Sequence, residues 1–282
     1  MKIARYAHRG TEGLGVVTKD GVVAIADHAP QAPRTMIDLI AGWDGLRSRI
    51  EALAAEGTPI PLDEVKLLAP IARPSKLFGI GLNYADHIAE SGMERPTDQT
   101  WFSMPPTAAS GPFDPIALPR VSTQLDYEAE LVVVIGKRCR YADRAAAADA
   151  IFGYCVGNDV SIRDWQFRTS QFLLGKSFDT HAPHGPWIVT RDAIDPMALD
   201  IECFVNGERR QSSNTRHMIF DPVAQVEHLS QVMTLEPGDL LFTGTPDGVG
   251  AVRKPPLWLV AGDKVRTTIS GIGTIENEVV AD

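Results

Sequence analysis

Apolar residues beyond about residue 75 occur mostly in short runs between turn residues, which is typical of short β-strands. The turns include Asn206-Gly207, Pro237-Gly238-Asp239, Ala261-Gly262-Asp263 and Ser270-Gly271. The runs predict strands over Leu77–Ile80, Leu131–Ile135, Tyr154–Val156, Trp187–Thr190, Ile201–Val205, Leu240–Thr243 and Lys264–Ile269.

Helical periodicity is sparse in this part of the chain. It predicts helices over Tyr84–Ser91, Arg144–Ala150, Val160–Leu173 and Val223–Val232. A regular alternation of strands and helices is missing, which disfavours a doubly wound parallel sheet. The sequence therefore predicts a β-rich α+β fold.

The first part of the chain has its own pattern. Asp20-Gly21 between apolar runs predicts a β-hairpin, and apolar residues at steps of three or four predict an amphipathic helix over Met36–Leu53. Prolines at positions 61, 70 and 74 then punctuate a stretch with little periodicity. We therefore predict a small N-terminal α/β domain over residues 1–72 and a larger domain over residues 73–282.

Charge and cysteine content narrow the class of protein. The formal net charge of −9 disfavours nucleic acid and anionic membranes as partners, because both attract basic surfaces. The cysteines Cys139, Cys155 and Cys203 form no CxxC motif, so we expect buried, reduced thiols. No run approaches the roughly 18 apolar residues of a membrane span, and no secretory signal is visible. These features predict a cytoplasmic protein.

Several familiar motifs are present but incomplete. Gly175-Lys176-Ser177 resembles the end of a P-loop without its first glycine, and Gly79-Ile80-Gly81 lacks the third glycine of a dinucleotide fingerprint. His181 and His184 flank a rigid Pro183 and lack a third ligand nearby, which indicates structural or solvated histidines more than a metal clamp.

Acidic residues alternate into the most apolar strand of the sequence. Asp126, Glu128 and Glu130 precede the apolar run Leu131–Ile135, and strand residues two apart share a face, with carboxylates roughly 7 Å apart. Such acids are often the solvated charges of an edge strand. Here the apolar continuation indicates a partly buried site, where a divalent cation would compensate the carboxylates.

A third acid of this kind is Asp159, at the end of a predicted strand. An aspartate in this position is commonly a helix N-cap. On the predicted helix that follows, Arg163 and Gln166 are three residues apart and share a face. A guanidinium beside the acids would bind an anionic ligand.

His87 and Glu90 form a possible acid–base pair. They are three residues apart on a predicted helix that Asn83 caps and Gly92 ends, so the carboxylate can orient the imidazole. Such a pair is often a surface ion pair. The segment that follows, Met93–Pro119, is rich in proline and glycine and predicts a long loop that suits an active-site lid.

These residues lie in stretches that together resemble the fumarylacetoacetate hydrolase superfamily, in particular its bacterial acylpyruvate-hydrolase-like members with a small N-terminal domain. The matching stretches occur in the family's order: Phe78–His87, Asp126–Leu131, Gly157–Asp164, Gly175–Thr180, Gly185–Trp187, Asn206-Gly207, Gly238-Asp239, Thr243–Pro246 and Gly262-Asp263.

The resemblance implies a mixed β-sandwich roll, usually a homodimer, and a set of site residues. It implies Mg²⁺ or Mn²⁺ at Glu128, Glu130 and Asp159, a water-activating pair of His87 and Glu90, and Lys176 beside the metal and substrate. The same resemblance implies that Arg163, Gln166 and Thr245 contact the substrate. One departure is Met104, where many relatives place lysine.

The implied activity is hydrolysis of a carbon–carbon bond in a 2,4-dioxo acid such as an acylpyruvate, fumarylpyruvate or a diketo-deoxy sugar acid. The products would be pyruvate or a related 2-oxo acid and a carboxylic acid. Oxaloacetate decarboxylation, or isomerisation or hydration of a 2-oxo acid, are the alternative reactions within the superfamily. A non-catalytic module with a structural ion site is the alternative outside it.

Overall fold

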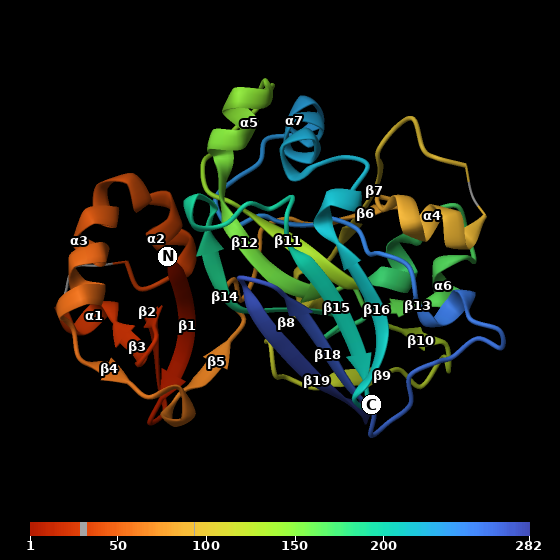
Figure 1. Cartoon of the computed structure of the whole chain (residues 1–282), viewed down its shortest axis with the longest axis horizontal. Helices are drawn as coiled ribbons and strands as arrows, with labels where there is room; N and C mark the ends of the chain where they lie inside the picture. The colour runs from red at the N-terminus through yellow and green to blue at the C-terminus, as the bar shows by residue number, and fades with distance from the viewer. Residues whose placement is uncertain (29–32, 93) are drawn as a thin grey trace.

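The computed structural model describes residues 1–28, 33–92 and 94–282, and most of its strands join one large mixed sheet (Figure 1). Two short strands lie off its main path: β5 (Lys66–Leu68) pairs with β1, and β8 (Ala109–Ser110) pairs with β14. The path runs through β4 (Pro59–Ile60), β3 (Gly21–Ala24), β2 (Thr11–Thr18), β1 (Lys2–His8), β14 (Ala182–Thr190), β12 (Ile151–Asn158), β11 (Ala129–Ile135), β17 (Leu240–Phe242), β6 (Leu77–Gly81) and β7 (Thr100–Met104).

Smaller sheets complete the strand content. β10 (Leu125–Asp126) pairs with β13 (Ser161–Ile162). A separate sheet has the order β16 (Glu208–Asn214), β15 (Asp200–Val205), β18 (Lys264–Ile269), β19 (Gly273–Ala281) and β9 (Ile116–Leu118).

β11 carries the core because both of its faces are buried. Leu131 and Val133 belong to a cluster that includes Ile201 of β15, so this face of the large sheet packs against the second sheet. Val132 faces the other way, into a cluster that includes Leu39 of the N-terminal part. A strand buried on both sides needs a continuous apolar run, which explains the sequence Leu131–Ile135.

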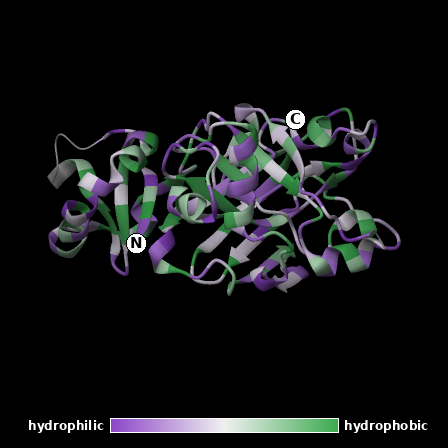
Figure 2. Cartoon of the chain, turned by 90° about the horizontal axis from the view of Figure 1, so that it is seen from above, coloured by the Kyte–Doolittle hydropathy of each residue, from purple (hydrophilic) through white to green (hydrophobic). Residues whose placement is uncertain are grey.

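The helices are short and lie around the sheets. α1 to α3 accompany β1 to β5 at one end of the molecule, and α5 and α7 lie together (Figures 1 and 2). None of the helices in the described ranges is long and apolar enough to cross a membrane. The bounds are Ile25–His28 (α1), Met36–Ala41 (α2), Trp43–Glu56 (α3), Ala85–Ser91 (α4), Arg144–Ala150 (α5), Arg163–Gln166 (α6) and Pro222–Val232 (α7), with 3₁₀ turns at Leu62–Glu64, Pro106–Ala108, Phe172–Lys176, Arg191–Ala193, Thr215–His217 and Gly250–Val252.

The N-terminal strands extend the large sheet. β1 pairs antiparallel with β14, with Lys2 opposite Val189 and Ile3 opposite Ile188. Main-chain hydrogen bonds therefore join the N-terminal part to the strands that carry the central core.

The predicted β-rich α+β fold is confirmed, as are the predicted strands and the hairpin, in which Thr18 pairs with Gly21. The helices α5 and α7 are also confirmed, each capped by an aspartate: Asp143 Oδ1 accepts from Ala146 N at 2.8 Å, and Asp221 Oδ1 from Ala224 N at 2.9 Å. Cys155 and Cys203 are buried free thiols as predicted, whereas Cys139 is half-buried.

Two predicted helices are wrong in extent. The helix predicted over Val160–Leu173 is only α6, because Ser161 and Ile162 pair with β10 instead, and Thr169 Oγ1 accepts the backbone N–H of Gln171 at 3.1 Å. The helix predicted over Met36–Leu53 is divided at Gly42, which ends α2 before α3 begins, in keeping with the low helix propensity of glycine.

The predicted loop over Met93–Pro119 is also wrong. Its first residue, Met93, lies outside the described residues, but Thr100–Met104 forms β7 and pairs antiparallel with β6. β8 and β9 lie further along the same segment. The prolines bound these short strands, so proline content alone did not distinguish a loop from edge strands.

Of the two alternatives for His181 and His184, structural and solvated, the structure supports the first, because both lie inside the fold. Nε2 of His181 lies 2.8 Å from the carbonyl of Ala117, and Nδ1 of His184 lies 3.1 Å from that of Ala182. Both side chains are buried, and burial lowers the pKa of each to about 4. They are therefore neutral hydrogen-bond donors at neutral pH.

We expect these histidines to make the fold less stable in mild acid. The unfolded chain binds protons at histidine below a pH of about 6.5, whereas folded His184 stays neutral down to about 4. The free energy of unfolding therefore falls with pH in this window, by about 2 kcal/mol per histidine at pH 5. Urea unfolding at pH 7.5 and pH 5 measures this fall. Between these two pH values, the free energy of unfolding of His184→Asn should fall by about 2 kcal/mol less than that of the wild type.

The matched change at the exposed His228, His228→Asn, should keep the wild-type pH dependence. His184→Asn retains a nitrogen donor near the position of Nδ1, so the fold should survive. If the free energy of unfolding of His184→Asn depended on pH as that of the wild type does, His184 would not be the buried neutral group that we infer.

Candidate active site

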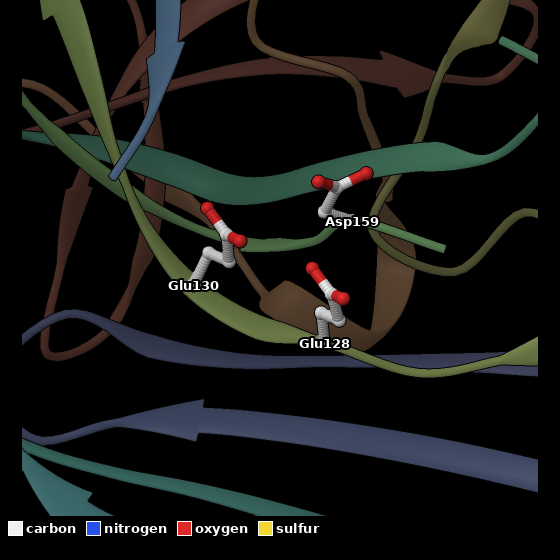
Figure 3. Close-up of side chains that lie close together, drawn as sticks. All are labelled: Glu128, Glu130 and Asp159. Carbon is white, nitrogen blue, oxygen red and sulfur yellow. The ribbon is translucent and has the colours of Figure 1, made fainter. Parts of the chain in front are cut away.

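Three carboxylates converge where β11 and β12 lie side by side (Figure 3). Ala129 pairs with Asn158, so the start of β11 lies beside the end of β12. Glu130 is in β11, Glu128 precedes it and Asp159 follows β12. One oxygen of each carboxylate lies within 4.8 Å of the others, and all three residues are buried. The alternation of the sequence therefore brings Glu128 and Glu130 to one site, and strand pairing adds Asp159.

Asp126 does not join this cluster, although the alternation predicted a shared face. The extended run breaks at Tyr127, so Asp126 belongs to β10. Its Oδ2 accepts from Arg163 Nε at 2.8 Å and from Ala251 N at 3.0 Å, and its Oδ1 accepts from Gly250 N at 2.7 Å. Asp126 therefore anchors Arg163 to the 3₁₀ turn Gly250–Val252.

Lys176 lies between two of the carboxylates. Its Nζ is 2.7 Å from Glu128 Oε2 and 2.8 Å from Asp159 Oδ2, and the side chain is 2% exposed. Burial acts to lower the pKa of Lys176, but the charges of Asp159 and Glu128 outweigh it and raise the pKa. Burial also opposes ionisation of Glu128, yet Lys176 and Arg163 hold its pKa at about 2. Lys176 is thus a fixed positive charge beside an ionised Glu128.

The carboxyls of Glu130 and Asp159 have too little positive charge around them to favour ionisation. Burial, followed by the charges of Asp159 and Glu128, raises the pKa of Glu130 well above its usual range. Burial raises the pKa of Asp159 to about 6 despite Lys176. Oδ1 of Asp159 is buried without a hydrogen-bond partner among the described residues. Hard oxygen donors that need compensating charge suit Mg²⁺ or Mn²⁺, so Glu128, Glu130 and Asp159 fit a divalent cation.

Arg163 is held on several sides next to the carboxylates. Besides Asp126, its Nη1 lies 2.6 Å from Glu128 Oε1 and donates to Gln166 Oε1 at 2.8 Å. The shared face predicted for Arg163 and Gln166 is therefore confirmed, on α6 instead of a long helix. The guanidinium is buried and immobilised by its partners.

Thr245 and two residues without a predicted role support the main chain of the site. Thr245 Oγ1 donates to the carbonyl of Ala129 at 2.9 Å and accepts from Gln211 Nε2 at 2.8 Å. Gln211 Oε1 accepts from Ala129 N at 2.9 Å, and Asn158 Oδ1 accepts from Glu128 N at 2.8 Å. A polar residue in a strand gives no local signal of such a long-range role, so the sequence did not reveal Gln211 or Asn158.

His87 and Glu90 lie on α4 with His87 Nδ1 3.7 Å from Glu90 Oε2. Glu90 Oε2 also accepts the backbone N–H of Gly248 at 2.9 Å. The carboxylate is therefore held near the imidazole by a second contact, as a residue that orients a base requires.

The helix start differs from its predicted form. Tyr84 and not Asn83 occupies the cap position of α4, whereas Gly92 ends the helix in the left-handed region at φ 67° as predicted. The Asn83 side chain is buried and donates to the carbonyl of Thr243 at 2.7 Å, and its Oδ1 accepts from Phe220 N at 2.8 Å. Asn83 thereby ties the entry of α4 to the end of β17.

A cavity of about 140 Å³ opens onto these groups. Glu128 lines the cavity, with Glu130 and Asp159 next to Glu128, and the lining side chains combine polar groups with an apolar wall. The lining residues are Ile80, Gly81, Leu82, His87, Phe102, Glu128, Arg163, Gln166, Phe167, Phe172, Lys176, Thr245, Val249, Ala251 and Val252. A small pocket with converging charged groups is the geometry of a small-molecule site.

Comparison with known proteins defines the class. The family described as "Fumarylacetoacetate (FAA) hydrolase C-terminal" matches residues 76–280, and "Rv2993c-like, N-terminal" matches residues 1–70. The chain therefore belongs to the fumarylacetoacetate hydrolase family, as the sequence motifs indicated. Its relatives include hydrolases, isomerases and tautomerases of oxo acids.

Individual relatives differ in the reaction they are named for. The chain is 44% identical over 272 residues to a mitochondrial oxaloacetate tautomerase of Bos taurus, covering 95% of this chain and 87% of that protein. Its fold matches a maleylpyruvate hydrolase from Sphingobium sp. SYK-6 in complex with manganese(II) and pyruvate, at TM-score 0.85 and 36% identity. It also matches a fumarylacetoacetate hydrolase from Exiguobacterium antarcticum, at TM-score 0.90 and 37% identity. The structural matches cover 100% of this chain and at least 99% of each of the two proteins.

We expect Glu130→Gln to weaken Mn²⁺ binding by on the order of 100-fold, because one of three anionic donors becomes a neutral amide. The amide oxygen can still accept the backbone N–H of Gly244, which donates to Glu130 Oε2 at 2.7 Å, so the fold should be retained. Calorimetric titration with Mn²⁺ measures the Kd. Glu276→Gln, an exposed change on β19, is the matched control, and an unaltered Kd in Glu130→Gln would refute the assignment.

Proposed function

We propose that this protein is a Mg²⁺- or Mn²⁺-dependent hydrolase that cleaves a carbon–carbon bond in a 2,4-dioxo acid. The observation that carries the proposal is that Glu128, Lys176 and His87 line one cavity, with the other two carboxylates beside Glu128 and the carboxylate of Glu90 beside His87. A non-catalytic ion site would not require His87 or Lys176 at the same cavity.

Glu128, Glu130 and Asp159 would hold the divalent cation. When bound, the cation supplies Lewis-acid polarisation of substrate oxygens. Lys176 contributes a second, permanent positive charge at the same point, because its ammonium group is buried between Glu128 and Asp159. Preorganised charge of this kind stabilises negative charge that develops on the substrate.

His87 is the proposed base. It takes a proton from water, which adds to the C4 carbonyl of the 2,4-dioxo acid, and the C3–C4 bond then breaks. The electron pair stays on C3 as the enolate of pyruvate, near the charge of Lys176, and C3 finally takes a proton. Water and substrate are thus converted into pyruvate and a carboxylic acid. Glu90 orients the imidazole and stabilises its protonated form.

Tautomerisation of oxaloacetate is the second candidate, favoured by the 44% identity to a named oxaloacetate tautomerase. In that reaction His87 would move a proton between carbon and oxygen of the substrate without an attacking water. The same charged floor stabilises the enol form in both reactions. The family resemblance further supports a homodimer as the working unit.

We expect His87→Ala to lower kcat for 2,4-dioxo acid cleavage by about 10²- to 10⁴-fold, the usual contribution of a general base. Mn²⁺ affinity should stay at the wild-type value, because the proposed ligands are the carboxylates of Glu128, Glu130 and Asp159 and not His87. His217→Ala, at an exposed position, is the matched control. Full activity of His87→Ala would contradict the assigned base.

Product analysis by NMR separates the two reactions. Cleavage gives equal amounts of pyruvate and a carboxylic acid, whereas tautomerisation only accelerates keto–enol exchange of oxaloacetate. Exchange without cleavage of any acylpyruvate or fumarylpyruvate would replace the hydrolase proposal with the tautomerase.

A further inference from the structure

The cavity has two chemically different parts. Its floor carries the charged groups of Glu128, Arg163 and Lys176, whereas the remaining wall is largely apolar. The apolar residues of the wall are Ile80, Leu82, Phe102, Phe167, Phe172, Val249, Ala251 and Val252. A 2-oxo acid bound by its oxygens at the floor would place its other end along this wall.

Three aromatic rings form a row along the cavity, and we call Phe102, Phe172 and Phe167 the aromatic row. The ring centroids of Phe102 and Phe172 are 6.1 Å apart, as are those of Phe172 and Phe167. Lys176 Nζ lies 5.2 Å from the ring centroid of Phe102, so the row begins at the charged floor. It ends at Phe167, whose side chain is 65% exposed. An exposed aromatic ring at a cavity gains free energy when an apolar group covers it.

Within the described residues, the cavity lining offers no spare positive charge. Arg163 and Lys176 are its cations, and each is already paired with carboxylates. Arg168 follows Phe167 in the sequence, and its guanidinium lies 3.8 Å from the ring centroid of Trp165 and 3.7 Å from Asp164. Met104, the position where many relatives place lysine, is 4% exposed in the core and does not line the cavity.

Two carboxylates lie next to His87, which lines the cavity. Glu90 Oε2 is 3.7 Å from His87 Nδ1, and Asp86 Oδ1 accepts the backbone N–H of His87 at 2.9 Å. A second carboxylate on the substrate would therefore meet like charges near His87 and an apolar wall elsewhere.

We propose that the substrate's distal acyl group is uncharged and apolar, and that Phe167 and Phe172 select it. This inference rests on the proposed function and narrows it to acylpyruvates with an alkyl or aryl acyl group. Dicarboxylates of the maleylpyruvate type would be poor substrates. Phe167 and Phe172 are then specificity-determining residues.

The test is a kcat/KM series on the full-length enzyme with Mn²⁺, from acetylpyruvate to hexanoylpyruvate. Each added methylene that becomes buried should raise kcat/KM about fourfold. Butanoylpyruvate should exceed succinylpyruvate, a dicarboxylate with the same acyl chain length, by at least about 100-fold. Phe167→Ala should reduce the gain per methylene in the longer substrates to under about twofold. Phe113→Ala, at another exposed phenylalanine, should keep the wild-type series.

The inference would be overturned if succinylpyruvate were cleaved as well as or better than butanoylpyruvate. It would also be overturned if Phe167→Ala kept the wild-type gain in kcat/KM per methylene. Neither result would contradict the proposed hydrolase function. Binding provides a readout that needs no turnover. In calorimetry with Mn²⁺, 2-oxohexanoate should bind at least about tenfold more tightly than the dicarboxylate 2-oxoadipate. If 2-oxohexanoate bound more tightly but no substrate were cleaved, the proposed hydrolase function would be refuted and the proposed preference for an apolar acyl group supported. Tighter binding of 2-oxoadipate would refute that preference.

Discussion

The structure depends on a buried cluster of charges in which the carboxylates outnumber the cations. Asp126, Glu128, Glu130 and Asp159 face Arg163 and Lys176, and every one of these residues is at most 6% exposed. Removing so many charges from water costs several kcal/mol per ion unless partners compensate it. Arg163 pairs with Asp126 and Glu128, and Lys176 is shared between Glu128 and Asp159, so two cations face four carboxyls. The raised pKa values of Glu130 and Asp159 express that deficit, and a divalent cation has the charge that removes it.

The main chain holds this unfavourable cluster in place. β11 is covered on both faces by apolar packing, so its register is firmly set, and the pairing of Ala129 with Asn158 fixes Asp159 beside Glu128. The side chains of Gln211 and Asn158 accept the N–H groups of Ala129 and Glu128 and so hold this part of the main chain in place. The apolar core therefore supplies the stability that lets like charges approach within 4.8 Å.

The sequence revealed those features that depend on neighbouring residues. Alternation placed Glu128 and Glu130 together, and helical spacing placed Arg163 beside Gln166. Features that depend on distant partners were missed or wrong. The break at Tyr127 turns Asp126 toward Gly250, Ser161 leaves the predicted helix to pair with Asp126, and the role of Gln211 needs a strand far along the chain. In each case a tertiary contact overrides the local pattern.

The proposed function also accounts for a family that contains both hydrolases and tautomerases. In both proposed reactions negative charge develops on an enolate, and the buried ammonium group of Lys176 would stabilise that charge whichever bond changes. The choice of reaction would then depend on what lies within reach of His87: a water molecule that attacks a carbonyl, or a proton on the substrate itself. The apolar wall would influence this choice, because an acyl group that covered Phe167 and Phe172 would keep water to the polar side of the cavity, where Glu90 lies 3.7 Å from His87. Substrate preference and reaction type would thus be linked through the same few side chains.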